Sequence, residues 1–200
     1  MSEATVPVPS SLPVRLVRLY GGLALYGLAT ALLLESGLGN NPWGVFHQGL
    51  SLLTGMSLGT AIIVVGALVM LLWIPLRQKP GFGTVSNVIF IGLFADASMY
   101  VLPTPGHLVA EVFYLTTGVV TLALATVLYI GAGLGPGPRD GIMTGLMRLG
   151  LSVRTSRLLI EVTVLIAGWL LGGTAGMGTL VFALAIGPLT QLFTRWFPLT

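Results

Sequence analysis

Apolar residues occur in six long stretches, separated by short polar or glycine-rich segments. The stretches cover residues 16–35, 57–76, 84–102, 111–131, 156–172 and 178–194. A helix that crosses about 30 Å of hydrocarbon needs about 20 mainly apolar residues. The pattern therefore predicts an all-α integral membrane protein with six transmembrane helices.

Two shorter segments interrupt this pattern, residues 37–55 after the first stretch and residues 133–150 after the fourth. Each opens with a glycine-rich break, GLGNNP or GLGPGP, and continues with about 12 residues, too few to cross a bilayer at about 1.5 Å per residue. We expect a half-helix over 41–54 and another over 137–150. The pattern leaves open whether each is re-entrant or interfacial.

The two short segments belong to an internal repeat. Residues 37–50, GLGNNPWGVFHQGL, align with residues 133–146, GLGPGPRDGIMTGL, at an offset of 96. After a slip of one residue, 81–92 also aligns with 176–187. Three spans in each half would turn the second half upside down relative to the first. The sequence thus predicts two inverted three-helix repeats, over 15–103 and 104–200, after a cytoplasmic tail at 1–14.

The composition is typical of a membrane protein and limits the classes of binding partner. Only 8% of the residues are charged and 54% are hydrophobic, whereas a soluble domain carries about a quarter charged residues. The net charge is +3, but the nine Lys and Arg residues are scattered and make no basic stripe for nucleic acid. We therefore expect the lipid bilayer, and no nucleic acid, as a partner.

The basic residues predict the orientation of the helices. With six spans and the N-terminus inside, all of them fall on the cytoplasmic side: Arg15, Arg18, Arg77, Lys79, Arg139, Arg148, Arg154, Arg157 and Arg195. The outer connections at 104–107 and 172–176 carry none, as the positive-inside rule requires. If the two short segments were full spans, giving eight helices, Arg77 and Lys79 would lie outside. We expect six spans with both termini in the cytoplasm, and the eight-helix alternative stays open.

Two segments resemble a known family. GPGPRDGIMTGLMRLGLSVRTSRLLIEVTVLIAGWLLGGTAGMGTLVFALAIGPLTQLF, and NPWGVFHQGLS in the first half, are similar to the YczE/YyaS/YitT family of bacterial membrane proteins. The resemblance covers nearly the whole chain after residue 14 and implies a multi-pass protein of the bacterial plasma membrane, without naming a substrate. Relatives commonly carry an acid after the tryptophan of the first motif, where this chain has Gly44, equivalent to Asp140. A symmetric pair of acids is therefore not essential here.

Asp96 is the first candidate for a functional residue. A charged side chain in the middle of an apolar helix costs about 2.5–3.5 kcal/mol on insertion scales, so its presence needs a reason. Its repeat equivalent is Gln191. Either burial keeps Asp96 neutral, which suits proton coupling, or a cation from another helix pairs with it, and Arg139 is the candidate. The alternative is that Asp96 has no function beyond a polar packing contact.

The starts of the two half-helices are the second candidate. Pro42 and Pro138 suit the first helical position, and Asn41 suits the cap before it. Free backbone amides at such a start attract an anion or a carboxylate. The polar residues at the two starts are Asn40, Asn41, His47 and Gln48 in the first half and Arg139 and Asp140 in the second. We predict that these side chains contact a ligand; the alternative is an interfacial helix with its polar face in water.

Arg157 and Glu161 lie one turn apart in the fifth stretch. Residues at this spacing face each other on a helix, so we predict a structural ion pair. Paired charges near the edge of a bilayer are tolerated.

Signatures of enzymes and cofactor sites bear on the function. HExxH, GxSxG, P-loop and dinucleotide signatures are absent from the sequence, and there is no cysteine. We therefore expect no enzyme, no catalytic residue, no metal and no cofactor. Inverted repeats with interrupted helices are typical of secondary transporters. The sequence favours a transporter or permease for a small solute, with proton coupling as an option. A non-transporting accessory or scaffold protein is the alternative, and self-association stays open.

Overall fold

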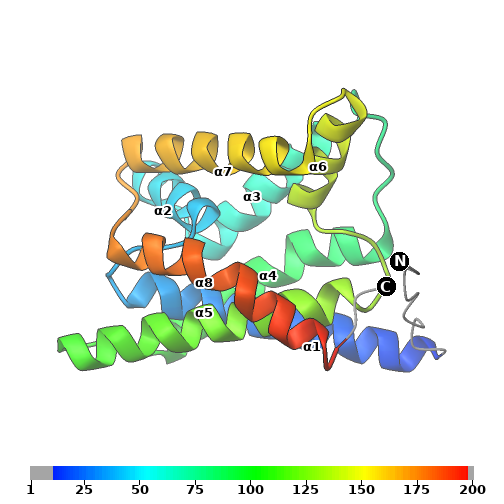
Figure 1. The fold of residues 1–200 in the computed structure, drawn as a ribbon. Coiled ribbons are helices and arrows are strands. Elements are labelled where there is room, and N and C mark those ends of the chain that lie inside the picture. Colours follow the sequence, from blue (N-terminus) through cyan, green and yellow to red (C-terminus); the bar gives the residue numbers. More distant parts are fainter. Residues whose placement is uncertain (1–10, 198–200) are drawn as a thin grey trace.

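The computed structural model describes residues 11–197, which form eight α-helices and no strand (Figure 1). In chain order these are α1 (Leu12–Glu35), α2 (Pro42–Thr54), α3 (Leu58–Leu71), α4 (Phe82–Val101), α5 (Leu108–Ile130), α6 (Pro138–Arg148), α7 (Val153–Leu170) and α8 (Met177–Thr194). The all-α prediction is confirmed for this part of the chain. Most of the predicted cytoplasmic tail, residues 1–10, lies outside the described residues.

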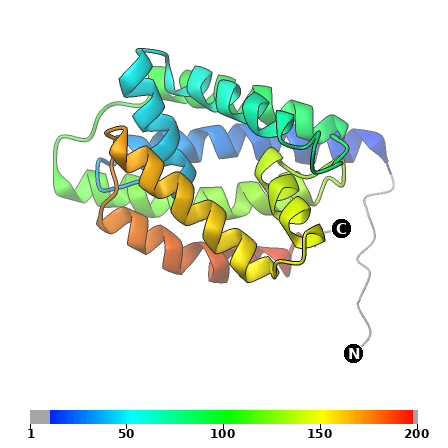
Figure 2. The same cartoon turned by 90° about the horizontal axis from the view of Figure 1, so that it is seen from above.

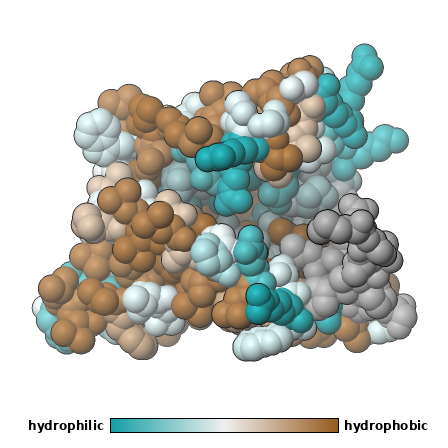
Figure 3. All heavy atoms as spheres, in the orientation of Figure 1, coloured by the Kyte–Doolittle hydropathy of each residue, from teal (hydrophilic) through white to brown (hydrophobic). Residues whose placement is uncertain are grey.

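The long helices α1, α4, α5 and α8 pack together, and α2, α3, α6 and α7 lie along one side of this group (Figures 1 and 2). Helix α1 is central, because it packs against both α4 and α5, while α8 packs on the far side of α5. Helix α7 packs mainly on α2, and α3 mainly on α4. The outer faces are covered by exposed apolar side chains, as expected of a surface in contact with lipid (Figure 3).

By length and hydropathy, four helices are able to cross a membrane: α1, α4, α5 and α8. Helices α2 and α3 together make a fifth candidate, but they are bent by 111° at a short break. Alone, α3 has 14 residues and reaches about 21 Å at 1.5 Å per residue, short of the hydrocarbon core. The stretch expected over 156–172 falls in α7, which carries Arg154, Arg157 and Glu161. The described residues thus form a multi-pass membrane protein, and the count of six spans goes beyond what length and hydropathy support.

The two short helices begin where their prolines predict. Pro42 and Pro138 occupy the first turns of α2 and α6. The Asn41 side chain accepts a hydrogen bond of 2.9 Å from the Gly44 backbone N–H, so its predicted role as the N-cap of α2 is confirmed. Helix α2 ends at Thr54 and is capped by Gly55, whose φ of 74° is a left-handed value that glycine adopts without strain.

Helices α1 and α5 approach each other closely at two glycines. A Cβ atom on Gly22 of α1 would lie 2.7 Å from the Tyr129 backbone nitrogen on α5. A Cβ atom on Gly118 of α5 would lie 3.0 Å from the Leu33 side chain on α1. The sequence repeat relates the two contacts to each other. Gly22 is equivalent to Gly118 and Leu33 to Tyr129, with 96 positions between the members of each pair. Helices α1 and α5 run antiparallel, because the earlier residue of α1 contacts the later residue of α5 and the later residue of α1 contacts the earlier one.

A second matched pair of contacts joins the loops to the helices. The Gly83 N–H donates a 2.7 Å hydrogen bond to the Leu134 carbonyl, and the Gly178 N–H donates one of 2.8 Å to the Leu38 carbonyl. The loop after α1 is thereby fixed to the start of α8, and the loop after α5 to the start of α4. Each of these contacts crosses from one half of the sequence to the other.

The Gly22 contact predicts a sharp difference between two adjacent glycines. Gly22→Leu places a side chain against the α5 backbone, and overpacking of this kind costs about 1–3 kcal/mol, so we expect a clearly lower unfolding temperature in detergent. Gly21→Leu is the matched control, because a Cβ atom there meets nothing within 4 Å. Equal unfolding temperatures for the two variants would contradict the α1–α5 contact.

Candidate functional site

A half-open cavity of about 470 Å³, lined by both polar and apolar side chains, lies between α7 and α8 and reaches the starts of α2 and α6. In Figure 3 polar side chains gather at the middle of the face shown, between apolar surfaces above and below. Seven of the eight helices contribute residues to the lining of the cavity, and α3 is the exception. The polar residues that line it are Tyr26, Asn41, Asn87, Thr126, Tyr129, Arg139, Asp140, Arg157, Glu161, Thr190, Gln191 and Thr194.

The cavity exists because α7 and α8 lie apart. In the first half, α3 packs on α4 through Gly59 and Gly92, each so close that a side chain would collide with the carbonyl of the other. Gly187, the repeat equivalent of Gly92 in α8, has nothing within 4 Å of an added Cβ atom. On α7, Glu161 stands where α3 has Gly66. The charged face of α7 thus borders a polar space instead of a helix.

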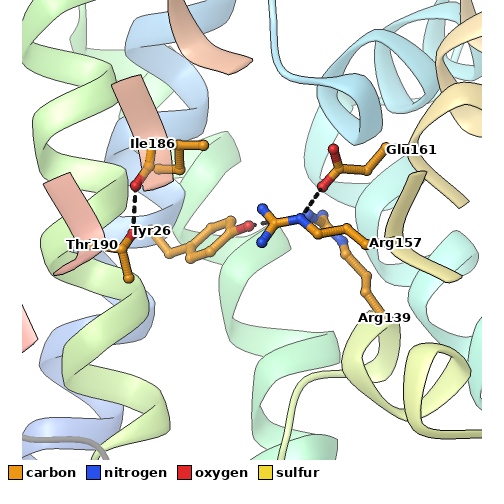
Figure 4. A network of polar contacts seen from close by, with 6 residues as sticks. All are labelled: Tyr26, Arg139, Arg157, Glu161, Ile186 and Thr190. Carbon is orange, nitrogen blue, oxygen red and sulfur yellow. Dashed lines mark hydrogen bonds and ion pairs between the residues drawn. The ribbon is translucent and has the colours of Figure 1, made fainter. Parts of the chain in front are cut away.

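Arg139, in the first turn of α6, projects into this cavity (Figure 4). Its Nη1 donates a 3.0 Å hydrogen bond to the Tyr26 hydroxyl. Its guanidinium carbon lies 4.7 Å from the centre of the Trp43 ring and 5.9 Å from that of the Tyr26 ring, both within the range of cation–π attraction. Trp43 and Arg139 are 96 positions apart, so the two short helices meet at equivalent residues.

Asp140 is held by its own helix and by α5. One oxygen of its carboxylate accepts hydrogen bonds from the Gly137 N–H at 3.1 Å and from the Tyr129 hydroxyl at 3.2 Å. The Trp73 indole N–H donates a 2.9 Å bond to the Pro138 carbonyl at the same helix start. The start of α6 is therefore anchored on two sides, which fixes where the Arg139 side chain begins.

The predicted ion pair between Arg157 and Glu161 is present, with 2.9 Å between Nε and Oε1 (Figure 4). The side chains are 58% and 38% exposed, so the pair itself adds little stability. Both residues line the cavity, as does Gln191. Sequence reasoning placed the ion pair correctly but missed its position at the cavity.

The structure separates Asp96 from the cavity and from Arg139. The Asp96 carboxylate accepts hydrogen bonds from the Gly59 backbone N–H at 2.6 Å and from the Ser57 hydroxyl at 2.5 Å, both at the start of α3. The suggested pairing of Asp96 with Arg139 is therefore wrong, because the Arg139 side chain contacts Tyr26 and Trp43. The exposed amides at the start of α3 explain how an acid is accommodated in α4.

Three candidates in the first half lie away from the cavity. The Gln48 side chain forms two hydrogen bonds with Thr174, of 3.0 Å and 2.8 Å, and thereby joins α2 to the α7–α8 loop. The Asn40 side chain is buried and accepts a 2.8 Å bond from the Asn41 N–H. His47 is buried and lines a smaller cavity, of about 20 Å³, together with Arg139. Of the first-half candidates, Asn41 is the one that lines the larger cavity.

Sequence reasoning missed six of the polar residues that line the cavity, Tyr26, Asn87, Thr126, Tyr129, Thr190 and Thr194, and also Trp43. Asn87 carried the same signal as Asp96, a polar side chain within an apolar helix. The aromatic residues gave no such signal, because rings are common in apolar helices. Within residues 11–197, no group of three or more His, Asp or Glu side chains is placed to hold a metal ion.

Comparison with known proteins places this chain in a family. The model of the family of unknown function DUF6198 matches residues 13–195. The chain belongs to this family. An uncharacterized protein of Haemophilus influenzae is 37% identical over 172 residues, which cover 86% of this chain and 79% of that protein. No solved structure matches the chain.

Two relatives come from Bacillus subtilis, and one of them is named as a membrane protein. The uncharacterized membrane protein YczE is 32% identical over 84% of this chain and 80% of its own length. The uncharacterized protein YyaS is 26% identical over 87% of this chain and 90% of its own. This is a YczE/YyaS-type family of membrane proteins, as the two sequence motifs indicated.

The contacts of Asp96 predict a role in stability. Asp96→Asn keeps the shape but removes one of the two acceptors that serve Gly59 and Ser57, so we expect a loss of about 1 kcal/mol, typical of a lost helix cap. Thermal unfolding in detergent measures it, with Glu111→Gln, an acid in the first turn of α5, as the control. If Asp96→Asn left stability unchanged but altered solute binding, the capping role would be refuted.

Proposed function

We propose that the protein is a transporter or permease for a small solute in the bacterial plasma membrane, with the cavity as its solute site. The cavity carries this proposal. Its volume of about 470 Å³ lies within the usual range of small-molecule sites, about 300–1,000 Å³. Charged side chains such as Arg139 and Asp140 between the helices of an apolar protein are costly unless partners, water or a ligand compensate them.

The matched contacts support two inverted three-helix halves. Helices α1 and α5 are antiparallel and touch through Gly22 and Gly118 at equivalent places. The short helices meet at Trp43 and Arg139, also equivalent positions. In transporters with inverted repeats, the site forms at the repeat interface from interrupted helices, and this cavity has that position.

Differences between equivalent contacts support two alternating states. Helix α7 packs tightly on α2, where a side chain at Gly168 would overlap the Phe46 backbone. At the equivalent place α3 carries Trp73, whose indole fills the space beside Gly141 of α6. The first half has α3 closed on α4, and the second has α7 away from α8. If the halves exchanged these arrangements, the cavity would open on the opposite side, which is alternating access.

The proposed orientation follows from the basic residues. Cavity-lining residues Arg157 and Thr194 lie near the start of α7 and the end of α8, the ends that the positive-inside rule assigns to the cytoplasm. In this orientation both termini are cytoplasmic, and the state described is open to the cytoplasm.

A non-transporting scaffold protein is the alternative function. It would need an apolar docking face but no such cavity, so the cavity favours transport. We propose no catalytic activity, cofactor or nucleic-acid partner; the proposed partners are lipid and a small solute, with proton coupling and self-association as further options.

Filling the cavity tests the proposal. Purified protein is screened against small solutes for thermal stabilisation, since a ligand that binds only the folded state raises its stability. Thr190→Phe should abolish the stabilisation by any solute found, because Thr190 lines the cavity. Thr116→Phe is the matched control: both threonines donate to the carbonyl four residues earlier, and Thr116 is exposed on α5. Loss of binding in both variants, or in neither, would contradict the cavity site.

Single cysteines test the orientation, because the parent chain has none. We expect cysteines at Lys79 and Ser152 to react with a membrane-impermeant thiol reagent only from the cytoplasm, and one at Gly106 only from outside. Labelling of residue 79 from outside intact cells would overturn the six-span arrangement and support eight spans.

A further inference from the structure

We propose that the cavity recognises its solute through an oxyanion, a carboxylate or phosphate group, bound by Arg139 and Asn87 where the starts of α2 and α6 meet. This inference rests on the proposed function for transport, but anion binding is measurable without it. Two independent observations carry it: an arginine with most of its N–H donors unused, and a largely buried amide whose polar atoms open to the cavity without a protein hydrogen bond.

Arg139 is the arginine with unused donors. Among the described residues, the ion pair within 4.0 Å is the one between Arg157 and Glu161. The guanidinium has five N–H donors, and the structure engages it in a single hydrogen bond, to the Tyr26 hydroxyl. Several donors therefore remain for a ligand in the cavity.

The acids nearby are occupied elsewhere. Asp140 accepts from the Gly137 N–H and the Tyr129 hydroxyl, and Glu161 accepts from Arg157. Neither carboxylate is within ion-pair distance of Arg139. Asp140 therefore keeps a negative charge of its own beside Arg139, and an oxyanion is favoured by the unused N–H donors of the guanidinium and not by a net positive charge of the cavity.

Asn87 is the buried amide. It lies on α4, is 8% exposed, and lines both the larger cavity and the small one beside it. Its side chain makes no hydrogen bond to any of residues 11–197, and its polar atoms are open to the cavity, so they stay available to water or a ligand there. Its N–H₂ group is a donor suited to an oxyanion. Arg139 lines the same two cavities, so one ligand group can reach both side chains.

The starts of two helices add to these donors. Helices α2 and α6 both start at the cavity, where Pro42 and Pro138 are among its lining residues. The amide ends of the two helices are partly positive and favour an anion. The rings of Trp43 and Tyr26 lie beside the guanidinium, so they restrain its plane. A planar fork held in this way matches two oxygens of one carboxylate or phosphate.

The test is thermal unfolding of the detergent-purified protein with solutes matched in shape but not in charge. The probes are benzoate, benzamide and benzylammonium, with inorganic phosphate as a second oxyanion and micelles containing phosphatidylglycerol as a lipid source. We expect benzoate or phosphate to raise the unfolding temperature by several degrees, and benzamide and benzylammonium to leave it unchanged. Arg139→Gln should remove this shift, and Asn87→Leu should reduce it.

Two further variants make the result specific. Arg139→Lys keeps the charge but loses the fork, so the shift should shrink without disappearing. Arg148→Gln removes a charge from the other end of the same helix, where Arg148 contacts the Arg77 carbonyl, and the shift should persist. Persistence of the full benzoate shift in Arg139→Gln, or its loss in Arg148→Gln, would overturn the inference.

The outcomes also separate this inference from the proposed function. Stabilisation by benzamide or benzylammonium that is lost in Thr190→Phe would overturn oxyanion recognition and keep a solute site. An Arg139-dependent shift from phosphatidylglycerol alone would uphold oxyanion binding, identify a lipid headgroup as its source, and count against a soluble substrate. No Arg139-dependent shift with any oxyanion would refute the inference.

Discussion

The rest of the structure depends on the close approach of α1 and α5. At Gly22 and Gly118 the two helices come near enough to exclude a Cβ atom. In lipid, helices gain little from the hydrophobic effect, and small residues allow the backbone contact that holds them together. This antiparallel pair joins the two halves of the chain, and α4 and α8 pack on its outer sides.

Around this pair, the two halves use equivalent positions differently. Gly59 and Gly92 bring α3 and α4 into contact, whereas the equivalent of Gly92 in α8, Gly187, faces open space. The charged side chains of Arg157 and Glu161 stand on the opposing face of α7. Closing α7 on α8, as the proposed second state requires, would bury these charges and therefore needs a compensating partner such as a bound solute. The polar face of α7 therefore accounts for the cavity.

Inside the cavity, the polar groups fall into two sets. Asp140 and the Arg157–Glu161 pair have protein partners and contribute to local order. Arg139 and Asn87 retain free hydrogen-bonding capacity and face the space between the helices. Groups of the second kind are the ones that a ligand satisfies, because the folded chain leaves them incomplete. This distinction, more than the number of polar residues, supports the proposed binding site.

The sequence by itself determined the helices and their starts. The apolar stretches predicted all the long helices, and Asn41, Pro42 and Pro138 predicted where the short helices begin, because capping and helix geometry act within one or two turns. The Arg157–Glu161 pair was predictable for the same reason. The length of α3 was overestimated, because hydropathy continues through the turn after Leu71.

Only the tertiary structure decided which polar side chains share a site. Asp96 and Arg139 both stood out in the sequence, yet Asp96 serves the start of α3 while Arg139 lies between Trp43 and Tyr26. Tyr26, Asn87 and Arg139 come from three helices far apart in the chain, and the way these helices pack brings them to one cavity. Local pattern fixes what each residue does within its own helix, whereas its partners depend on distances that only the packed chain defines.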